Sequence, residues 1–599
     1  MARDPVSKDD REDTSEDAGA SSGDASTTPP PGLVSVEDSS TVIPLLNSDR
    51  QHKWINRQIT AAAETGQFDW LLHVIQSHLS SMNLINFSTA VHRVAKLALC
   101  SSVQEREQLL NQQEMWDLKK AVVSYVTNAV APDGSWRWSR RPEDQVSEMR
   151  CLSIICWSCA TLRIREEVLF TRAAAASRRR LGEMKPFELS NMLWSFAKLS
   201  FGEASYFEAI APYLLRRADG QFSPQCLSTI VWAFGTAKVH QPLVFTSFAR
   251  ELVANAHAMA PQGIANTAWA FARVRRQEAP LFRALAEAAT RNGVVWTFKP
   301  QELSNTVWAF ATVGLPHPLL FDCMADVAVS RRWELPPQNV ANMLWAYAKL
   351  LAPARTRLFP PLLEVTASRL EQYKPQEVSA ILWAVAREDV SGSFSNAKLF
   401  FLQVPRHFEA RLPDFTSQAL ACMAEAFVLA ETDNIPFFEA VMNESLSRLW
   451  SFQPPSLCTL LRGLVVRVKR HPSMATRAVH LQPVCAHIAQ RVGEMQPHNM
   501  LHLLQTLDLL PPDIKASEAK DLVECAAFAY PQSRGSGVPR GRAQPRRPGP
   551  CSPLRCCRWP RLRPCAHRAW RQRLRRPGLH GGRRRRRGGP PGAARQLAR

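Results

Sequence analysis

The chain has 599 residues, of which 45% are hydrophobic and 21% charged, and its formal net charge at pH 7 is +21. No run of about eighteen consecutive apolar residues occurs, so we expect neither a transmembrane helix nor a membrane partner. The 14 cysteines are scattered and no secretory signal precedes them, which excludes a disulfide-rich secreted domain and favours a reducing compartment.

The positive charge is concentrated at the C-terminus. Residues 534–599 contain 21 Arg and no Lys, Asp or Glu, whereas residues 1–50 contain 4 basic and 11 acidic side chains. Residues 51–533 therefore have a net charge of only +7. The sequence pI of 9.8 consequently says little about what the central part of the chain binds.

Residues 1–50 are predicted to be a disordered acidic leader. Asp, Glu, Ser, Thr and Pro dominate this segment, and it has too few large apolar side chains to form a core. It does not resemble an organellar presequence, which would be rich in Arg and poor in acidic residues.

Residues 51–145 have a helical pattern and contain a divergent first repeat, in which His92 takes the place that Trp has in later repeats. A polar segment follows at residues 130–145 and carries Trp136, Arg137, Trp138, Arg140 and Arg141.

Residues 146–390 contain a regular repeat of about 38 residues. The clearest copy, PQELSNTVWAFATV, begins at Pro300. Near-copies begin at Pro186, Pro224, Pro261, Pro337 and Pro375. The Trp of successive copies falls at positions 157, 194, 232, 269, 308, 345 and 383. A period this regular is typical of a solenoid of stacked repeats.

Each repeat is predicted to be a pair of α-helices. With Leu303 numbered as position 0, apolar residues recur at positions 0, +4, +7 and +8, which is the period of a helix and not of a strand. Trp at +5 widens the apolar face, and a small residue at +6 lets neighbouring backbones approach closely. A second amphipathic stretch, such as residues 206–217, completes the unit. The predicted fold is all-α: an α-solenoid of stacked helical hairpins with about 38 residues per repeat, flanked by disordered termini.

The pattern weakens after Trp383. Residues 391–530 are predicted to be degenerate helical repeats in which Glu425, Arg462 and Gln505 take the Trp position. We interpret these replacements, and His92, as looser ends of the array. Residues 531–599 are rich in Arg, Pro and Gly and are predicted to be disordered. A shifted reading frame would produce the same abrupt change of composition, and both interpretations stay open.

Three polar positions recur on the first helix of each unit. Position +9 holds Lys198, Thr236, Arg273, Thr312, Lys349 and Arg387. Position +2 holds Asn191, Thr229, Asn266, Asn305, Asn342 and Ala380. Position −2 holds Gln225, Gln262, Gln301, Gln338 and Gln376, with Phe187 as the exception. Because residues four and seven apart share a helix face, we expect one polar stripe per helix, and stacking aligns the stripes along the solenoid.

The six +9 residues and the four Asn residues at +2 are the candidate RNA-binding residues. Amides can pair with base edges, and Lys and Arg can meet phosphates. An alternative for the Asn residues is an internal polar ladder, in which each amide bonds to a neighbouring backbone group or to the next Asn. For the Trp residues, packing in the core competes with stacking on bases, and we favour packing.

No catalytic or metal site is expected. The sequence contains no phosphate-binding P-loop, GxSxG or HExxH motif. Its recurring acids Glu188, Glu302 and Glu377 occur singly in first helical turns, where the helix dipole stabilises them. Cys156 and Cys159 form a CxxC with no second pair nearby, so we interpret them as core residues and not zinc ligands. We therefore expect no enzyme, no cofactor and no small-molecule substrate.

The period of 37–39 residues and the motif PQxLxNxxWAxAKL resemble the octatricopeptide repeat family of algal organelle RNA-binding proteins. They are also similar to the helical arrays of FAST-kinase-like and RAP-domain proteins and of the kinetoplastid RNA-editing substrate-binding complex. The resemblance covers residues 85–390 well and 390–530 weakly. The Arg-rich tail takes the place of the RAP domain that ends many of these relatives.

This resemblance implies binding of organellar transcripts in RNA processing, editing or stability, together with other RNA-processing proteins. The mitochondrial matrix is the first expectation for its location and the plastid the second. The leading hypothesis is a non-enzymatic solenoid that binds single-stranded RNA along its concave face. The alternative is a protein–protein scaffold without direct RNA binding, because solenoids use the same face for protein partners.

Overall fold

The computed structural model describes residues 48–137, 142–201, 204–217, 220–388, 395–430, 434–471 and 477–534. The chain divides into two units after Ser536, and residues 537–599 lie wholly outside the described residues. Residues 1–47 of the acidic leader, and Trp138, Arg140 and Arg141 of the polar segment, also lie outside them.

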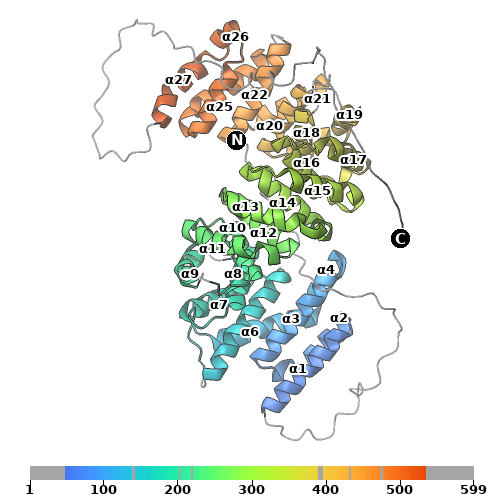
Figure 1. The fold of residues 1–599 in the computed structure, drawn as a ribbon, viewed down its shortest axis with the longest axis vertical. Helices are drawn as coiled ribbons and strands as arrows, with labels where there is room; N and C mark the ends of the chain where they lie inside the picture. Colours follow the sequence, from blue (N-terminus) through green and yellow to red (C-terminus); the bar gives the residue numbers. More distant parts are fainter. Residues whose placement is uncertain are drawn as a thin grey trace, which may run out of the picture. The chain divides into compact units, whose positions relative to one another are not determined.

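Helices stack in two layers, which confirms the predicted all-α solenoid (Figure 1). The first layer contains α1 (Ser48–Glu64), α3 (Leu84–Cys100), α6 (Pro142–Thr161), α8 (Pro186–Lys198), α10 (Pro224–Thr236), α12 (Pro261–Arg273), α14 (Pro300–Val313), α16 (Pro337–Leu350), α18 (Pro375–Glu388), α20 (Ser417–Leu429), α22 (Pro454–Arg470) and α25 (Pro497–Leu507). Consecutive first-layer helices pack against each other more extensively than the helices of the second layer do.

The second layer contains α2 (Phe68–His78), α5 (Gln113–Ala129), α7 (Glu167–Arg179), α9 (Ala204–Arg216), α11 (Pro242–Asn255), α13 (Ala279–Thr290), α15 (Pro318–Ser330), α17 (Arg355–Ser368), α19 (Ser395–Phe408), α21 (Ile435–Ser447) and α24 (Gln482–Gln490). The short helices α4 (Val103–Leu110) and α26 (Pro512–Ser517) and the helix α27 (Lys520–Arg534) complete the described part. Short 3-10 turns such as Arg332–Glu334 and Leu449–Ser451 lead from a second-layer helix into the next first-layer helix.

The described residues contain no β-strand, and an isolated bridge joins Val130 to Trp136. None of the helices in these ranges combines the length and apolarity that a membrane crossing requires.

The regular first-layer helices from α8 to α16 begin at repeat-equivalent residues and end close to one another in the repeat. Pro occupies the first turn, where its missing N–H costs no hydrogen bond. Where Glu lies at −1, its carboxylate accepts a hydrogen bond from the backbone N–H preceding the helix, as from Lys299 to Glu302 at 2.8 Å. The C-terminal ends share a residue in the left-handed backbone region, at Arg163, Ser200, Lys238, Arg275, Gly314 and Leu351.

The shared left-handed residue predicts opposite effects of two substitutions. Leu351 has φ of +52° and is 51% exposed, whereas Gly314 has φ of +75° and an added Cβ there would meet no atom within 4 Å. Leu351→Gly should raise the free energy of unfolding by up to about 1 kcal/mol, and Gly314→Ala should lower it by about 1 kcal/mol, because only glycine adopts this conformation without a steric cost. Urea denaturation measures both. A clear loss of stability in Leu351→Gly would show that contacts of the Leu side chain outweigh its backbone conformation.

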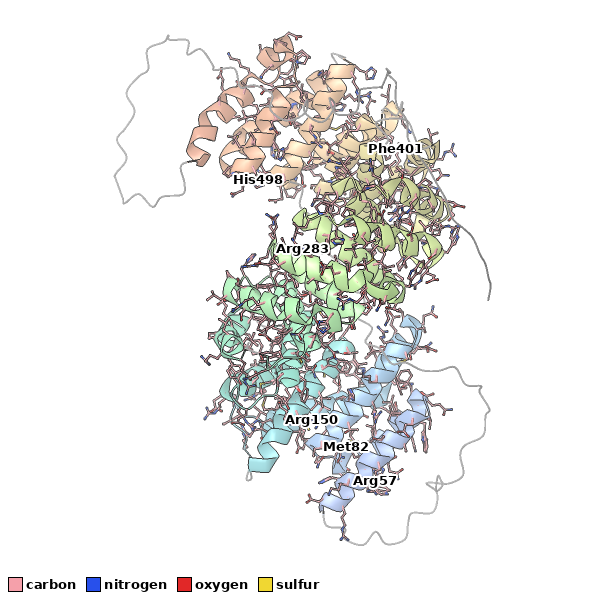
Figure 2. All side chains as sticks on the ribbon, viewed as in Figure 1. Arg57, Met82, Arg150, Arg283, Phe401 and His498 are labelled. Carbon is pink, nitrogen blue, oxygen red and sulfur yellow. The ribbon has the colours of Figure 1, made fainter. Side chains whose placement is uncertain are left out.

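Small and aromatic side chains hold the layers together (Figure 2 shows the described side chains). The residues at +6, including Ala309 and Ala346, are fully buried between first-layer helices, as predicted. Aromatic rings at +7 meet a Phe of the second layer edge to face, for example Phe282 and Phe310 with centroids 4.9 Å apart. The core is therefore continuous from unit to unit.

An arginine closes many of the helical hairpins. It lies at or just after the end of the second helix, and its guanidinium donates to the carbonyl just before the first helix of the same unit. Arg331 donates to the Phe298 carbonyl at 2.8 Å, and Arg491 to the Phe452 carbonyl at 2.7 Å. Equivalent bonds are made by Arg217, Arg369 and Arg448. These carbonyls precede the helices and would otherwise lack a partner, so each arginine fixes the start of a first-layer helix.

Candidate nucleic-acid interface

The Trp residues at +5 pack on one another along the first-layer helices. Trp157, Trp194, Trp232 and Trp269 form one run, and Trp308, Trp345 and Trp383 form another. Neighbouring ring centroids lie 6.2–6.5 Å apart, and the ring planes are inclined by 29–35°. The rings are buried or half-buried. We call these residues the Trp ladder; their packing supports the interpretation that they hold the repeats together.

Basic residues at +9 lie over the Trp ring of their own helix, one turn away. The charged groups of Lys198, Arg273, Lys349 and Arg387 lie 6.0, 6.0, 4.3 and 5.3 Å from the ring centroids of Trp194, Trp269, Trp345 and Trp383. A cation over an aromatic face is stabilised by about 0.5–1 kcal/mol at a partly exposed site. Neither Arg273 nor Arg387 forms an ion pair with a carboxylate in the described part of the chain. Arg273 and Arg387 are thus held in place by rings and not by local acids.

The Thr residues at +9 alternate with these cations. Thr236 and Thr312, and Thr161 at the same position of α6, have buried hydroxyls without a hydrogen-bond partner among the described residues. Unpartnered buried polar atoms are uncommon in proteins and mark places where water or a ligand supplies the partner.

The Asn residues at +2 do not form the internal ladder considered as their alternative role. Asn191, Asn266 and Asn305 are half-buried, and Asn342 is 5% exposed. In the described ranges, no hydrogen bond joins these amides to one another or to a neighbouring backbone group. Their hydrogen-bonding capacity is therefore not consumed within the fold.

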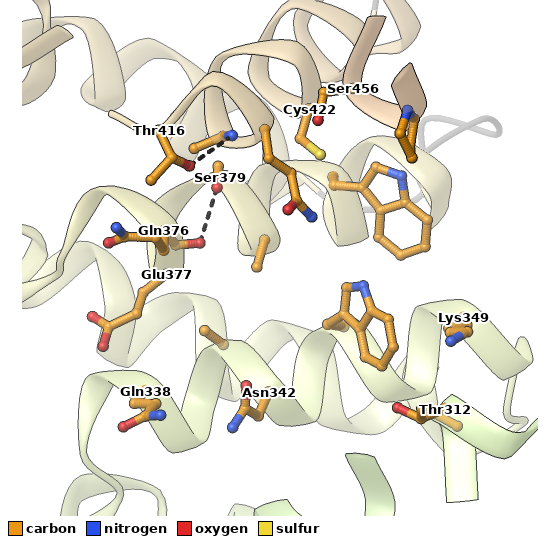
Figure 3. Close-up of a pocket in the computed structure, with 18 of the residues that line it drawn as sticks. Thr312, Gln338, Asn342, Lys349, Gln376, Glu377, Ser379, Thr416, Cys422 and Ser456 are labelled. Carbon is orange, nitrogen blue, oxygen red and sulfur yellow. Dashed lines mark hydrogen bonds between the residues drawn. The ribbon is translucent and has the colours of Figure 1, made fainter. Parts of the chain in front are cut away.

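A groove with a hollow of about 990 Å³ runs across the first-layer helices from α14 to α22 (Figure 3). It brings together four candidate residues, Thr312, Asn342, Lys349 and Arg387. In the close-up, Thr312, Gln338 and Asn342 lie on one side of the hollow, and Cys422 and Ser456 lie on the other. The remaining candidates, Lys198, Thr236, Arg273, Asn191, Asn266 and Asn305, lie at equivalent positions of α8–α14 and do not line the hollow.

Degenerate units supply about a third of the residues that line this hollow, which the sequence pattern did not predict. Gln418 and Cys422 come from α20, Ser456 comes from α22, and Gln453 immediately precedes α22. A signal was present, because Gln418 occupies position −2 of its unit, where earlier units also have Gln.

Glu425 and His92, two of the residues that replace Trp at +5, are packed against neighbouring side chains, so the interpretation of looser ends is wrong at these two positions. Arg462 and Gln505, which also replace Trp, are exposed. Glu425 is buried and forms an ion pair with Arg462, its equivalent in the next unit. Burial raises the pKa of the Glu425 carboxyl, and Arg462 opposes that shift. At the other end, the His92 ring packs 5.5 Å from the Trp157 ring. Burial, with Lys96 and Arg93 nearby, lowers the pKa of His92 to about 4, so this imidazole is neutral at pH 7.

The CxxC cysteines lie in the core. Cys156 and Cys159 are buried on α6, and burial raises the pKa of both thiols, that of Cys159 to about 12. Both are therefore protonated at pH 7, which suits neither a thiolate nucleophile nor a metal ligand. No group of three or more His, Cys, Asp or Glu side chains in the described ranges is arranged to hold a metal ion.

Residues 137–355 match the protein family described as RNA-editing substrate-binding complex 6 protein. The repeat array is similar to this family. The match confirms the predicted resemblance to helical-repeat subunits of that complex, and leaves the octatricopeptide and FAST-kinase-like resemblances as predictions.

No curated protein matches the chain. Among solved structures, a chain of "Homology model of the full-length AP-3 complex in an intermediate open conformation" matches with 10% sequence identity and a TM-score of 0.24. That match covers 80% of this chain and 92% of the other.

Proposed function

We propose that the array binds single-stranded RNA along the groove of its first-layer helices. It would act without catalysis, together with other proteins, in organellar RNA processing, editing or stability. The observation that carries the proposal is the series of basic side chains at +9, each held over a Trp ring beside a groove lined with amides. The family similar to residues 137–355, an RNA-editing substrate-binding complex protein, supports it.

The two edges of the groove have different chemistry. Lys and Arg at +9 lie near the C-terminal ends of the helices, and Asn at +2 and Gln at −2 lie near the N-terminal ends. Seven residues of helix separate +2 from +9, which is roughly 10 Å. An RNA strand can therefore place its phosphates on the +9 edge and turn its bases toward the amides.

The Trp ladder prepares the phosphate edge for binding. A long basic side chain in solution loses rotamer freedom when it binds a phosphate. Here the ring contacts already restrict Lys349 and Arg387 before RNA arrives. Less conformational entropy is lost on binding, so these cations contribute more affinity than mobile surface lysines.

Protein partners are also proposed, on a separate observation. Trp296, Trp333 and Trp450 occupy equivalent positions in the turns before α14, α16 and α22, and are 53%, 53% and 76% exposed. Tryptophans exposed to this extent are enriched at protein interfaces. We propose the mitochondrial matrix as the protein's first location and the plastid as the second, as the sequence resemblance implies.

Binding of single-stranded RNA across a salt series tests the proposal. A chain ending at Ser536 lacks nearly all of the Arg-rich tail and should still bind with micromolar or tighter affinity. That affinity should fall steeply as salt rises, because bound phosphates release counterions. Binding by the full-length chain alone would assign RNA contact to the tail and leave the array as a protein scaffold.

A further inference from the structure

The hollow in the groove has a local cause in two columns of the repeat. At position +2, Asn342 of α16 is followed by Ala380 of α18 and Cys422 of α20. Ala380 and Cys422 are smaller than Asn, so the groove deepens between these helices. Both line the hollow of about 990 Å³. Burial raises the pKa of the Cys422 thiol to about 12, so this side chain is neutral at pH 7 and lines the hollow without being a reactive group.

The Trp ladder also stops beside this hollow. Trp383 on α18 packs on Trp345 of α16, but α20 has Glu425 where the next ring would lie. Glu425 is buried and paired with Arg462. Among the described residues, Trp345 is the one aromatic neighbour of Trp383. The hollow therefore lies where the repeat omits both an amide and an indole.

The remaining lining suits a nucleotide. The described lining residues include one carboxylate, that of Glu377, and four basic side chains, those of Arg275, Lys349, Lys374 and Arg387. The Glu377 carboxylate already accepts a hydrogen bond from the Lys374 backbone at 2.8 Å. An anion is thus favoured over a cation. The volume is at the upper end of the range for small-molecule sites, about 300–1,000 Å³.

Unpartnered polar atoms border the same space. The Nε2 of Gln418 and the Oγ1 of Thr312 are buried and have no hydrogen-bond partner among the described residues. Gln376 also lines the hollow. An aromatic wall, amides, one of them without a partner, and adjacent cations are the elements by which proteins hold an unstacked base and its phosphate.

We propose that this hollow is the anchoring subsite of the groove, where an unstacked nucleobase of single-stranded RNA enters against Trp383. Gln376 and Gln418 face its hydrogen-bonding edge, and Arg387 meets the adjacent phosphate. The inference rests on the proposed RNA-binding function. It implies that base recognition is not shared equally by all units and is concentrated between α16 and α20. An aromatic contact with one base commonly changes affinity by about 5- to 150-fold.

Filling the hollow with the repeat's own residue tests the subsite. The variant is Ala380→Asn with Cys422→Asn, in the full-length chain, and the control is Thr229→Asn on α10, which restores Asn outside the hollow. The probe is a single-stranded RNA containing 4-thiouridine, cross-linked by light, with attachment sites mapped by mass spectrometry. The wild type and the control should cross-link within residues 376–387 and 416–425. The filled variant should lose these cross-links and bind about tenfold more weakly, with an unchanged salt dependence because no phosphate contact is removed.

Other outcomes separate the subsite from the groove. If the filled variant keeps both its cross-links and its affinity, the subsite is wrong, and the groove stands provided that removal of the +9 cations still abolishes binding. If the wild-type chain forms no cross-links on any first-layer helix, the proposed function itself is overturned. If circular dichroism shows that the filled variant does not fold, Gln376→Ala with Gln418→Ala replaces it. That variant should bind at least fivefold more weakly, and unchanged binding would overturn the subsite.

Discussion

Replacing Lys198, Arg273, Lys349 and Arg387 together with Ala should remove most of the RNA affinity of the array and leave it folded. Each phosphate contact on a single strand contributes about 0.7 to the slope of log affinity against log salt. Four lost contacts should therefore make this slope shallower by about 3. When salt rises from 50 to 200 mM, these four contacts account for about a 50-fold fall in affinity.

The array should survive this change because the four side chains lie at the edge of the groove. They are half-buried or exposed, and each loses an interaction of about 0.5–1 kcal/mol with its Trp ring. The losses are spread over four units, while the apolar core beneath them is unchanged. Circular dichroism and urea denaturation check the fold, and fluorescence anisotropy at four salt concentrations measures binding to the chain ending at Ser536.

A matched control removes the same charge from the other layer. Lys120, Arg250, Arg283 and Arg406 are exposed on α5, α11, α13 and α19. Their joint replacement with Ala alters the net charge equally but leaves the groove intact, so affinity should change by less than threefold. Equal losses in the two variants would mean that RNA responds to total charge, and the groove would then not be the binding site.

The period of the sequence predicts the fold because a repeat specifies its own neighbours. Once Trp194, Trp232 and Trp269 recur about 38 residues apart on helices, stacking places them in one column. The same reasoning brings the +9 cations to one edge. Their position over the rings also follows from sequence, since +5 and +9 are one helical turn apart.

Features that depend on departures from the period were harder to predict. The hollow is lined by two small residues, Ala380 and Cys422, and lies beside the place where Glu425 replaces a Trp, and none of these residues forms a motif by itself. Only the packing of the helices shows that the missing larger side chains would have been neighbours. The hairpin-closing arginines, such as Arg331 and Arg448, recur in sequence but bond to backbone carbonyls, which leave no pattern of their own.

The Glu425–Arg462 pair could have been predicted from the sequence. The two residues are 37 positions apart, one repeat period, and both occupy +5. Opposite charges in one column of consecutive repeats indicate an ion pair between stacked helices. Interpreting each residue singly, as a lost Trp, hid the relation between them.

Arg462→Ala should destabilise the array more than any other single change considered for it. Glu425 has a side chain only 2% exposed, and without Arg462 its charge would be buried without a partner. Removing one member of a fully buried pair costs about 3–5 kcal/mol. Since the Arg462 side chain is itself 45% exposed, water can partly reach the site, and we expect a loss of about 2–4 kcal/mol at pH 7.

The loss should depend on pH in a direction that identifies its cause. The pKa of Glu425 is raised in the folded protein by burial, and Arg462 lowers it. Without Arg462 that pKa rises further, so the folded variant binds the proton more tightly than the unfolded chain does. A carboxyl group with a raised folded pKa contributes stability below its unfolded pKa and loses it as pH rises through the folded pKa. The deficit of Arg462→Ala should therefore be largest at neutral pH and shrink as the pH falls toward the ordinary range of a glutamate.

A double-mutant cycle with Glu425→Gln separates charge from packing. In the Glu425→Gln background no buried charge remains, so Arg462→Ala should cost less than about 1 kcal/mol and show no pH dependence between pH 5 and 7.5. Urea denaturation of the four chains at both pH values measures the coupling. If Arg462→Ala costs the same with Glu as with Gln at position 425, the arginine acts through packing alone. The end of the Trp ladder would then be held by shape and not by charge.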